Sequence, residues 1–91
     1  MKVRWTESAA NRIEKIFEYI ALDNVDAAVR TVERIQAAID RAAQMPYAAR
    51  AGKRPGTREL IVLDTPYIVL YRILEEAIQI LRIMHGAQNW Q

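Results

Sequence analysis

The spacing of apolar residues changes once along this 91-residue chain, between Pro46 and Gly56, and this change limits the possible folds most. Before it, apolar residues recur every three or four positions, as on one face of an amphipathic helix. After it, Ile, Val, Leu and Tyr form dense runs that are typical of strands. A chain of this length forms one domain, so helices and strands must share a core. We therefore expect a single α+β domain over residues 1–91.

Two helices are expected before Pro46. Thr6 offers a hydroxyl N-cap to the first helix, over residues 7–22, and Asn24 offers a cap to the second. Pro46 ends the second helix because proline cannot continue the hydrogen-bond ladder. The first helix has an apolar face made of Ile13, Ile16, Phe17 and Ile20. Since only two or three residues separate the helices, we expect an antiparallel helical hairpin.

Strands are expected at both ends of the hairpin. Residues 2–5 alternate polar and apolar side chains, and three apolar runs follow the loop, at residues 57–63, 67–74 and 77–85. The connections between these runs are too short for parallel crossovers, so the runs form an antiparallel meander. The predicted order is β-α-α-β-β-β, with the helical hairpin packed on one face of a small antiparallel sheet. Strand order and the identity of the open face stay undetermined at this stage.

Positive charge is concentrated in the loop after the second helix. The whole chain carries a net charge of +2, and its first 45 residues balance seven basic against seven acidic side chains. Between positions 50 and 58, in contrast, four basic residues occur without an acidic one: Arg50, Lys53, Arg54 and Arg58. Such a loop can meet an acidic protein or a nucleic-acid backbone. The alternative is a solvated loop without a binding role.

Several chemistries are disfavoured by the composition. The chain has no cysteine, one histidine (His85), one serine and three glycines, which leaves no metal-ligand cluster, no Ser-His-Asp set and no phosphate-binding loop. We expect no cofactor and no metal. The first residues do not form a signal peptide, and the apolar runs are too short to cross a bilayer. The chain is therefore expected in the cytoplasm, without membrane contact. Its 52% hydrophobic content indicates either a partner that covers apolar surface or two alanine-rich helices that raise the count.

Four segments carry a family resemblance that extends over nearly the whole chain: Gly56–Leu60 (GTREL), Pro66–Tyr71 (PYIVLY), Ile80–Gly86 (ILRIMHG) and Gln88–Trp90 (QNW). In this order they resemble the ParE-type toxins of the ParE/RelE superfamily of type II toxin–antitoxin systems. The resemblance implies two helices packed on a small antiparallel sheet. It also implies a cognate antitoxin, with a disordered segment that folds on the toxin in a hetero-oligomeric complex.

The superfamily includes two activities, and this sequence is more similar to one of them. RelE-like members cut mRNA on the ribosome and typically carry an arginine at the position that Ile68 occupies here. Their basic or tyrosine-bearing tail is also missing, because the chain ends in Gly86–Trp90 followed by one glutamine. The ParE-like activity, inhibition of DNA gyrase by binding, requires no catalytic residue. We therefore expect a gyrase-binding inhibitor rather than an enzyme.

Candidate residues follow from each reading. For target binding we expect contributions from Arg50, Lys53, Arg54, Arg58, His85 and Trp90. If the chain is instead a ribosome-dependent mRNA endonuclease, the catalytic candidates are His85, Arg58, Arg72 and Arg82. A third reading is a non-toxic module that pairs with its antitoxin and helps repress its own operon. Direct sequence-specific DNA binding is not expected, because the second helix mixes basic and acidic residues and has no basic recognition face.

Overall fold

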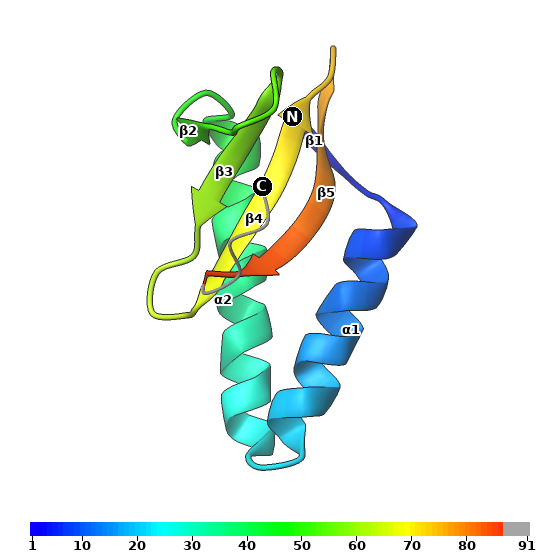
Figure 1. Cartoon of the computed structure of the whole chain (residues 1–91), viewed down its shortest axis with the longest axis vertical. Helices are drawn as coiled ribbons and strands as arrows, with labels where there is room; N and C mark the ends of the chain where they lie inside the picture. The colour runs from blue at the N-terminus through cyan, green and yellow to red at the C-terminus, as the bar shows by residue number, and fades with distance from the viewer. Residues whose placement is uncertain (87–91) are drawn as a thin grey trace.

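The computed structural model describes residues 1–86, so Trp90 and the rest of residues 87–91 lie outside the described residues. Its elements are β1 (Lys2–Trp5), α1 (Glu7–Ala21), α2 (Val25–Gln44), β2 (Arg50–Ala51), β3 (Thr57–Ile61), β4 (Tyr67–Ile73) and β5 (Ala77–His85). The two helices and four longer strands confirm the expected β-α-α-β-β-β order (Figure 1). The two-residue β2 is an addition within the basic loop.

The helices begin and end where local chemistry predicts. The Thr6 hydroxyl accepts the Ala9 N–H at 3.2 Å, and the Asn24 side chain accepts the Ala27 N–H at 2.9 Å. Both side chains satisfy backbone donors that a helix N-terminus leaves without a partner. α2 ends at Gln44, two residues before Pro46. Neither helix among residues 1–86 is long and apolar enough to cross a membrane.

The sheet has the strand order β1-β5-β4-β3-β2 and is mixed rather than purely antiparallel. β3, β4 and β5 form the expected antiparallel meander, and β2 extends it by an antiparallel pairing with β3. β1 runs parallel to β5, with Lys2 opposite Ala77 and Trp5 opposite Ile80. A parallel pair needs a long connection, and nearly the whole chain lies between these two strands. Short connections therefore force antiparallel pairing within the meander but do not constrain the direction of β1.

Both helices pack on one side of the sheet: α2 lies behind its strands, α1 lies along β5, and their hairpin extends beyond the sheet at its connecting end (Figure 1). The core lies between this helical layer and the covered face. Its large side chains include Ile16, Ile35, Ile39, Val69, Tyr71, Ile78, Ile80 and Ile83. Each of these residues is at most 4% exposed.

A β-bulge in β5 decides which of its residues face the core. Leu70 pairs with Arg82 but Tyr71 pairs with Ile80, so Leu81 is an extra residue in β5. The extra residue shifts the alternation of side chains by one position. Ile80 and Ile83 can therefore both face the helices, where they are 0% and 4% exposed. The sequence alone shows apolar residues on both faces of this strand, and the bulge resolves that ambiguity.

Candidate functional site

On the face of the sheet opposite the helices, which we call the open face, most of the charged side chains are basic. Residues paired across strands point to the same side of a sheet, so the register assigns each strand residue to a face. The charged strand residues on the open face are Lys2, Arg4, Arg50, Glu59, Arg72 and Arg82. Five basic residues and one acidic residue thus share this face, whereas the strands' other face is largely apolar core.

A polar row crosses four strands of the open face. Arg4 of β1 lies opposite Gln79 of β5, Gln79 lies opposite Arg72 of β4, and Arg72 lies opposite Thr57 of β3. The Arg72 Nε donates a hydrogen bond to the Gln79 Oε1 at 2.7 Å. This bond orients the Arg72 guanidinium across the sheet. The row therefore presents two arginines, an amide and a hydroxyl in one line.

A second row lies beside the first. Arg82 is opposite Leu70, Leu70 is opposite Glu59, and Glu59 is opposite Arg50. The Arg50 Nε donates to the Glu59 Oε1 at 2.9 Å, and Glu59 is 8% exposed. Arg50 thereby neutralises the acidic residue of this face. As a result, Arg50 is committed to a contact within the sheet, unlike the solvated loop residue that its sequence context indicates.

A groove on the open face joins the basic loop to these rows. It is lined by Arg54, Pro55, Gly56, Thr57, Leu70, Arg72, Ile73, Leu74, Leu81 and Arg82. Three arginines from the β2–β3 loop, β4 and β5 therefore meet around a partly apolar floor. Lys53 is exposed in the same loop.

Local backbone geometry places Arg54 at this groove. Gly56 adopts φ +80, which favours glycine, and the Thr57 hydroxyl donates to the Arg54 carbonyl at 2.6 Å. The Gly52 N–H donates to the Thr57 carbonyl at 2.8 Å. A Cβ at position 52 would collide with the Thr57 hydroxyl. The turn therefore requires a glycine at position 52 and favours one at position 56.

Arg58 lies on the covered face, away from Arg50 and Arg54. Its guanidinium donates to the Tyr47 carbonyl at 3.2 Å and to the Ala49 carbonyl at 2.9 Å, and it stands 5.3 Å from the centre of the Tyr47 ring. These contacts hold the chain between α2 and β2 against the sheet. The structure does not bring Arg58 together with the other basic residues of the loop.

Tyr71 also holds the segment between α2 and β2 against the sheet. Its side chain is fully buried opposite Arg58, and its hydroxyl donates to the Pro46 carbonyl at 2.6 Å. Burial raises the pKa of the Tyr71 hydroxyl above its usual value, and the nearby Arg58 charge opposes that rise. Arg58 and Tyr71 together anchor the segment that leads into the basic loop.

His85 also lies on the covered side of the sheet. It is opposite Tyr67 at the end of β5, and the two rings meet edge to face with centroids 5.7 Å apart. The alternation of β5 after the bulge puts Arg82 and Met84 on the other side. The four nuclease candidates are thus divided: His85 and Arg58 belong to the covered face, and Arg72 and Arg82 to the open face.

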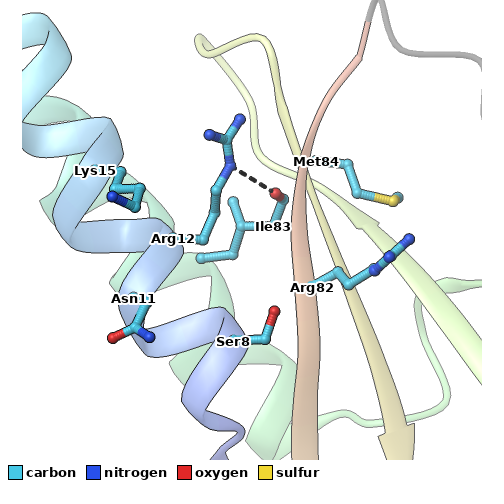
Figure 2. A pocket seen from close by; sticks show the side chains of 7 residues that line it. All are labelled: Ser8, Asn11, Arg12, Lys15, Arg82, Ile83 and Met84. Carbon is cyan, nitrogen blue, oxygen red and sulfur yellow. Dashed lines mark hydrogen bonds between the residues drawn. The ribbon is translucent and has the colours of Figure 1, made fainter.

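A second groove, between α1 and β5, has no signal in the sequence motifs. β1 ends at Trp5, so α1 is the neighbour of the outer edge of β5 from Leu81 onward. The groove is lined by Ser8, Asn11, Arg12, Lys15, Arg82, Ile83 and Met84 (Figure 2). The Arg12 Nε donates to the Ile83 carbonyl at 3.4 Å across it. β1 has four residues and β5 has nine, and this difference in length indicates that part of the β5 edge is not paired with β1.

Within residues 1–86 no group of three or more histidine, cysteine or acidic side chains could hold a metal ion.

The family model of the ParE toxin of the type II toxin–antitoxin system parDE matches residues 3–90. The chain belongs to the ParE toxin family. The candidate toxin Y4kP of Sinorhizobium fredii is 44% identical to it over 89 residues, covering 98% of this chain and 92% of Y4kP.

Other relatives of this ParE-family toxin come from both branches of the superfamily. Toxin RelE2 of Caulobacter vibrioides is 32% identical over 87 residues, covering 96% of this chain and 97% of RelE2. A solved chain of the chromosomal ParDE system from P. aeruginosa superposes with a TM-score of 0.82 at 28% identity, over 93% of this chain and 95% of that one. The YoeB/ParE toxin from Agrobacterium tumefaciens, at 19% identity, has a TM-score of 0.65 over 93% of this chain and 98% of its own, and shows the fold alone.

Proposed function

We propose that this toxin acts in the cytoplasm by binding DNA gyrase and blocking its reaction, without cleaving a bond itself, and that a cognate antitoxin neutralises it. The observation that carries this proposal is the division of the nuclease candidates by the sheet. A phosphoryl-transfer site needs cations and a proton-transferring group around one phosphate. His85 and Arg58 lie on the covered side, while Arg72 and Arg82 lie on the open face.

Ile68 supports the same conclusion. It lies on the open face, opposite Ile61 of β3 and Met84 of β5, in an apolar row. An arginine at this position, as RelE-like members typically have, would add a cation on the same face as Arg82, two residues along β4 from Leu70, which pairs with Arg82. The isoleucine leaves an apolar surface there, which can bind a protein but cannot stabilise a charged phosphate. Binding therefore explains this position better than catalysis does.

The groove between α1 and β5 is our candidate site for the antitoxin. An extended segment can add to the outer edge of β5 through main-chain hydrogen bonds, with the polar side chains of Ser8, Asn11 and Lys15 along its other side. The solved relative from P. aeruginosa belongs to a ParDE system, which supports an antitoxin of the same kind here. Such a partner would order on binding.

The second candidate function is ribosome-dependent mRNA cleavage. Its support is the similarity to RelE2 over almost the whole chain, together with the proximity of Arg72 and Arg82 in one groove. The non-toxic module remains the third reading. The three predict different outcomes when the chain is produced without an antitoxin.

The deciding experiment is a pulse-label measurement of DNA, RNA and protein synthesis after induction of this chain alone in bacteria, followed by a supercoiling assay with purified gyrase. We expect DNA synthesis to fall first, and supercoiling by gyrase to be inhibited in vitro. An early collapse of protein synthesis with active gyrase would favour the RelE-like reading. Normal growth with a folded toxin would favour the non-toxic module.

Two variants test the residues of this proposal. His85 contacts Tyr67 and lies away from the arginine groove, so we now expect it neither to bind the target nor to act in catalysis, and His85→Ala should keep its toxicity. Loss of toxicity in a folded His85→Ala protein would assign His85 a role in target binding or in catalysis. We expect joint replacement of Lys53 and Arg54 by glutamine to weaken toxicity; Arg50 is kept, because it pairs with Glu59. The matched control replaces Arg30 and Arg34 on the outside of α2, which removes the same charge; equal loss in both would exclude the loop as a specific contact.

A further inference from the structure

We propose that the open face of the sheet binds the phosphate backbone of a nucleic-acid duplex directly, without reading its sequence. This activity concerns DNA itself and does not depend on gyrase. It uses Arg4, Arg72 and Arg82, of which Arg4 has no role in any function described above. The inference begins with the distribution of charge and continues with the spacing of these side chains.

The charge of the open face is strongly one-sided. Its strands carry Lys2, Arg4, Arg50, Arg72 and Arg82 against Glu59 alone, and Arg50 already pairs with Glu59 at 2.9 Å. Among residues 1–86, the strand residues of this face therefore carry a net charge of about +4. Arg54 and Lys53 extend the positive charge at the edge of the sheet formed by the β2–β3 loop. A surface of this sign attracts a polyanion and raises its association rate.

The outer surface of α2 shows that this distribution is not general. Arg30, Arg34 and Arg41 are exposed there, but exposed acidic residues are interspersed with them: Asp26, Glu33 and Asp40. A helix face of mixed sign does not attract a polyanion as the open face does. Three arginines of α2 can therefore be compared with three of the open face, Arg4, Arg72 and Arg82, in opposite electrostatic surroundings. This contrast supplies the matched control for the experiment below.

The spacing of the open-face arginines fits a phosphate backbone. Arg4 and Arg72 share one row and lie two inter-strand gaps apart, which amounts to about 10 Å. A single DNA strand rises about 3.4 Å per phosphate along the helix axis, so about three phosphates fall within that span. Arginine guanidinium groups match phosphate oxygens in a bidentate geometry. The bond from Arg72 to Gln79 holds one of these groups in place before binding.

A duplex fits this face better than a single strand or an acidic peptide. Proteins that bind single strands use aromatic side chains as stacking platforms, and among residues 1–86 the register places no aromatic residue of the strands on the open face. An extended peptide is about 5 Å wide and follows one row at a time. The basic residues run instead from Arg4 at one edge of the sheet to Arg54 near the other. A duplex has phosphates on two strands, so it can contact the basic residues at both edges of the sheet.

Fluorescence anisotropy with a labelled 20-base-pair duplex tests this proposal, using the full-length toxin between about 50 and 200 mM salt. If three phosphates are neutralised, the affinity should fall with salt with a log–log slope of about −2.7. We expect Arg4→Gln/Arg72→Gln/Arg82→Gln to weaken binding at least about 10-fold and to flatten the slope. The control, Arg30→Gln/Arg34→Gln/Arg41→Gln, removes the same charge and should bind within about 2-fold of the wild type. Duplexes of unrelated sequence should bind equally.

Other outcomes would overturn the proposal. These are no binding by the wild type at the lowest salt, equal weakening by the two triple variants, tighter binding of a single strand, or displacement of the duplex by an equal charge of polyglutamate. Circular dichroism checks folding, and Arg4→Gln/Arg82→Gln, which keeps the bond between Arg72 and Gln79, serves if the triple variant does not fold. Since the assay contains no gyrase, its failure leaves the gyrase proposal intact, and failure of the supercoiling assay leaves this one intact.

Discussion

The two faces of the sheet are built from the same strands but differ in charge, although the open face also holds two buried apolar residues, Leu70 and Met84. On the covered face, Val69, Tyr71 and Ile80 are fully buried against the helices. On the open face, the neighbouring positions carry Arg72, Gln79 and Arg82. Because side chains alternate along a strand, one segment can stabilise the fold with every second residue and bind a partner with the others. The bulge at Leu81 preserves this separation in β5 where a strict alternation would break it.

Arginine itself shows how the face decides a residue's role. Arg58 donates to two main-chain carbonyls and stands over the Tyr47 ring, so it acts as a structural clamp. Arg72, on the adjacent strand, forms an exposed bond to Gln79 and lines a groove. The same side chain therefore contributes to stability on one face and to a binding surface on the other. The following predictions test this difference, from the largest expected effect to the smallest.

The first prediction compares one substitution on the two faces. Ile80→Ala removes a fully buried side chain from the core and should lower the free energy of unfolding by about 2–5 kcal/mol. Ile61→Ala, at a position of the open face that is 50% exposed, should cost less than about 1 kcal/mol. Urea denaturation of both proteins measures the difference. Similar losses would mean that the open face is also part of the core.

The second prediction compares the two arginines. Arg58→Met keeps a long apolar side chain but removes two hydrogen bonds to carbonyls and the contact with Tyr47, so we expect a loss of about 1–3 kcal/mol in unfolding free energy. Arg72→Met should change it by less than about 0.5 kcal/mol, since its bond to Gln79 is exposed. Chemical denaturation with matched protein concentrations checks both. A larger effect at Arg72 would reverse the assignment of roles.

The third prediction concerns the hydroxyl of Tyr71, the residue paired with Arg58. Tyr71→Phe removes the 2.6 Å hydrogen bond to the Pro46 carbonyl without changing the packing of the ring, which should cost about 1 kcal/mol. Tyr47→Phe is the control, because the Tyr47 side chain is 68% exposed. We expect no measurable change there. Equal melting temperatures for the wild type, Tyr71→Phe and Tyr47→Phe would show that the hydroxyl of Tyr71 does not stabilise the segment between α2 and β2.

The fourth prediction is a dependence of stability on alkaline pH. Desolvation by burial raises the pKa values of Tyr67 and Tyr71 above the usual 10.0, although a nearby arginine opposes each shift. A group whose pKa is raised on folding contributes stability that is complete below its unfolded pKa and is lost as pH rises toward its folded pKa. The free energy of unfolding should therefore decline above about pH 10. Tyr67→Phe/Tyr71→Phe should flatten this decline; an unchanged slope would assign it to other groups.

Much of the fold could be predicted because its signals are local. Thr6, Asn24 and Pro46 mark the ends of the helices through hydrogen bonds and steric limits that act within a few residues. The short connections of the meander enforce antiparallel pairing for the same reason. The pairing of β1 with β5 could not be predicted, because it joins residues more than 70 positions apart and has no local signature. The two-residue β2 is too short to stand out from its loop.

The candidate site could be predicted only in part. Charge counting identified Arg54 and Lys53, which lie at the edge of the open face. It also grouped them with Arg50 and Arg58, although one of these pairs with Glu59 and the other clamps the chain on the covered face. Linear spacing within a loop does not say on which side of a strand a side chain will lie. Arg4 could not be predicted as a site residue, since its partners in the row come from distant strands.

The amino-acid sequence alone predicted an α+β fold, the positions of its helices and meander, and its likeness to the ParE toxins. These features follow from periodicity, caps and short connections, which depend on neighbouring residues. Which arginines gather on one face was decided by the tertiary structure. Strand register and the bulge at Leu81 set that arrangement, because a shift of one residue in pairing moves every following side chain to the opposite face of the sheet.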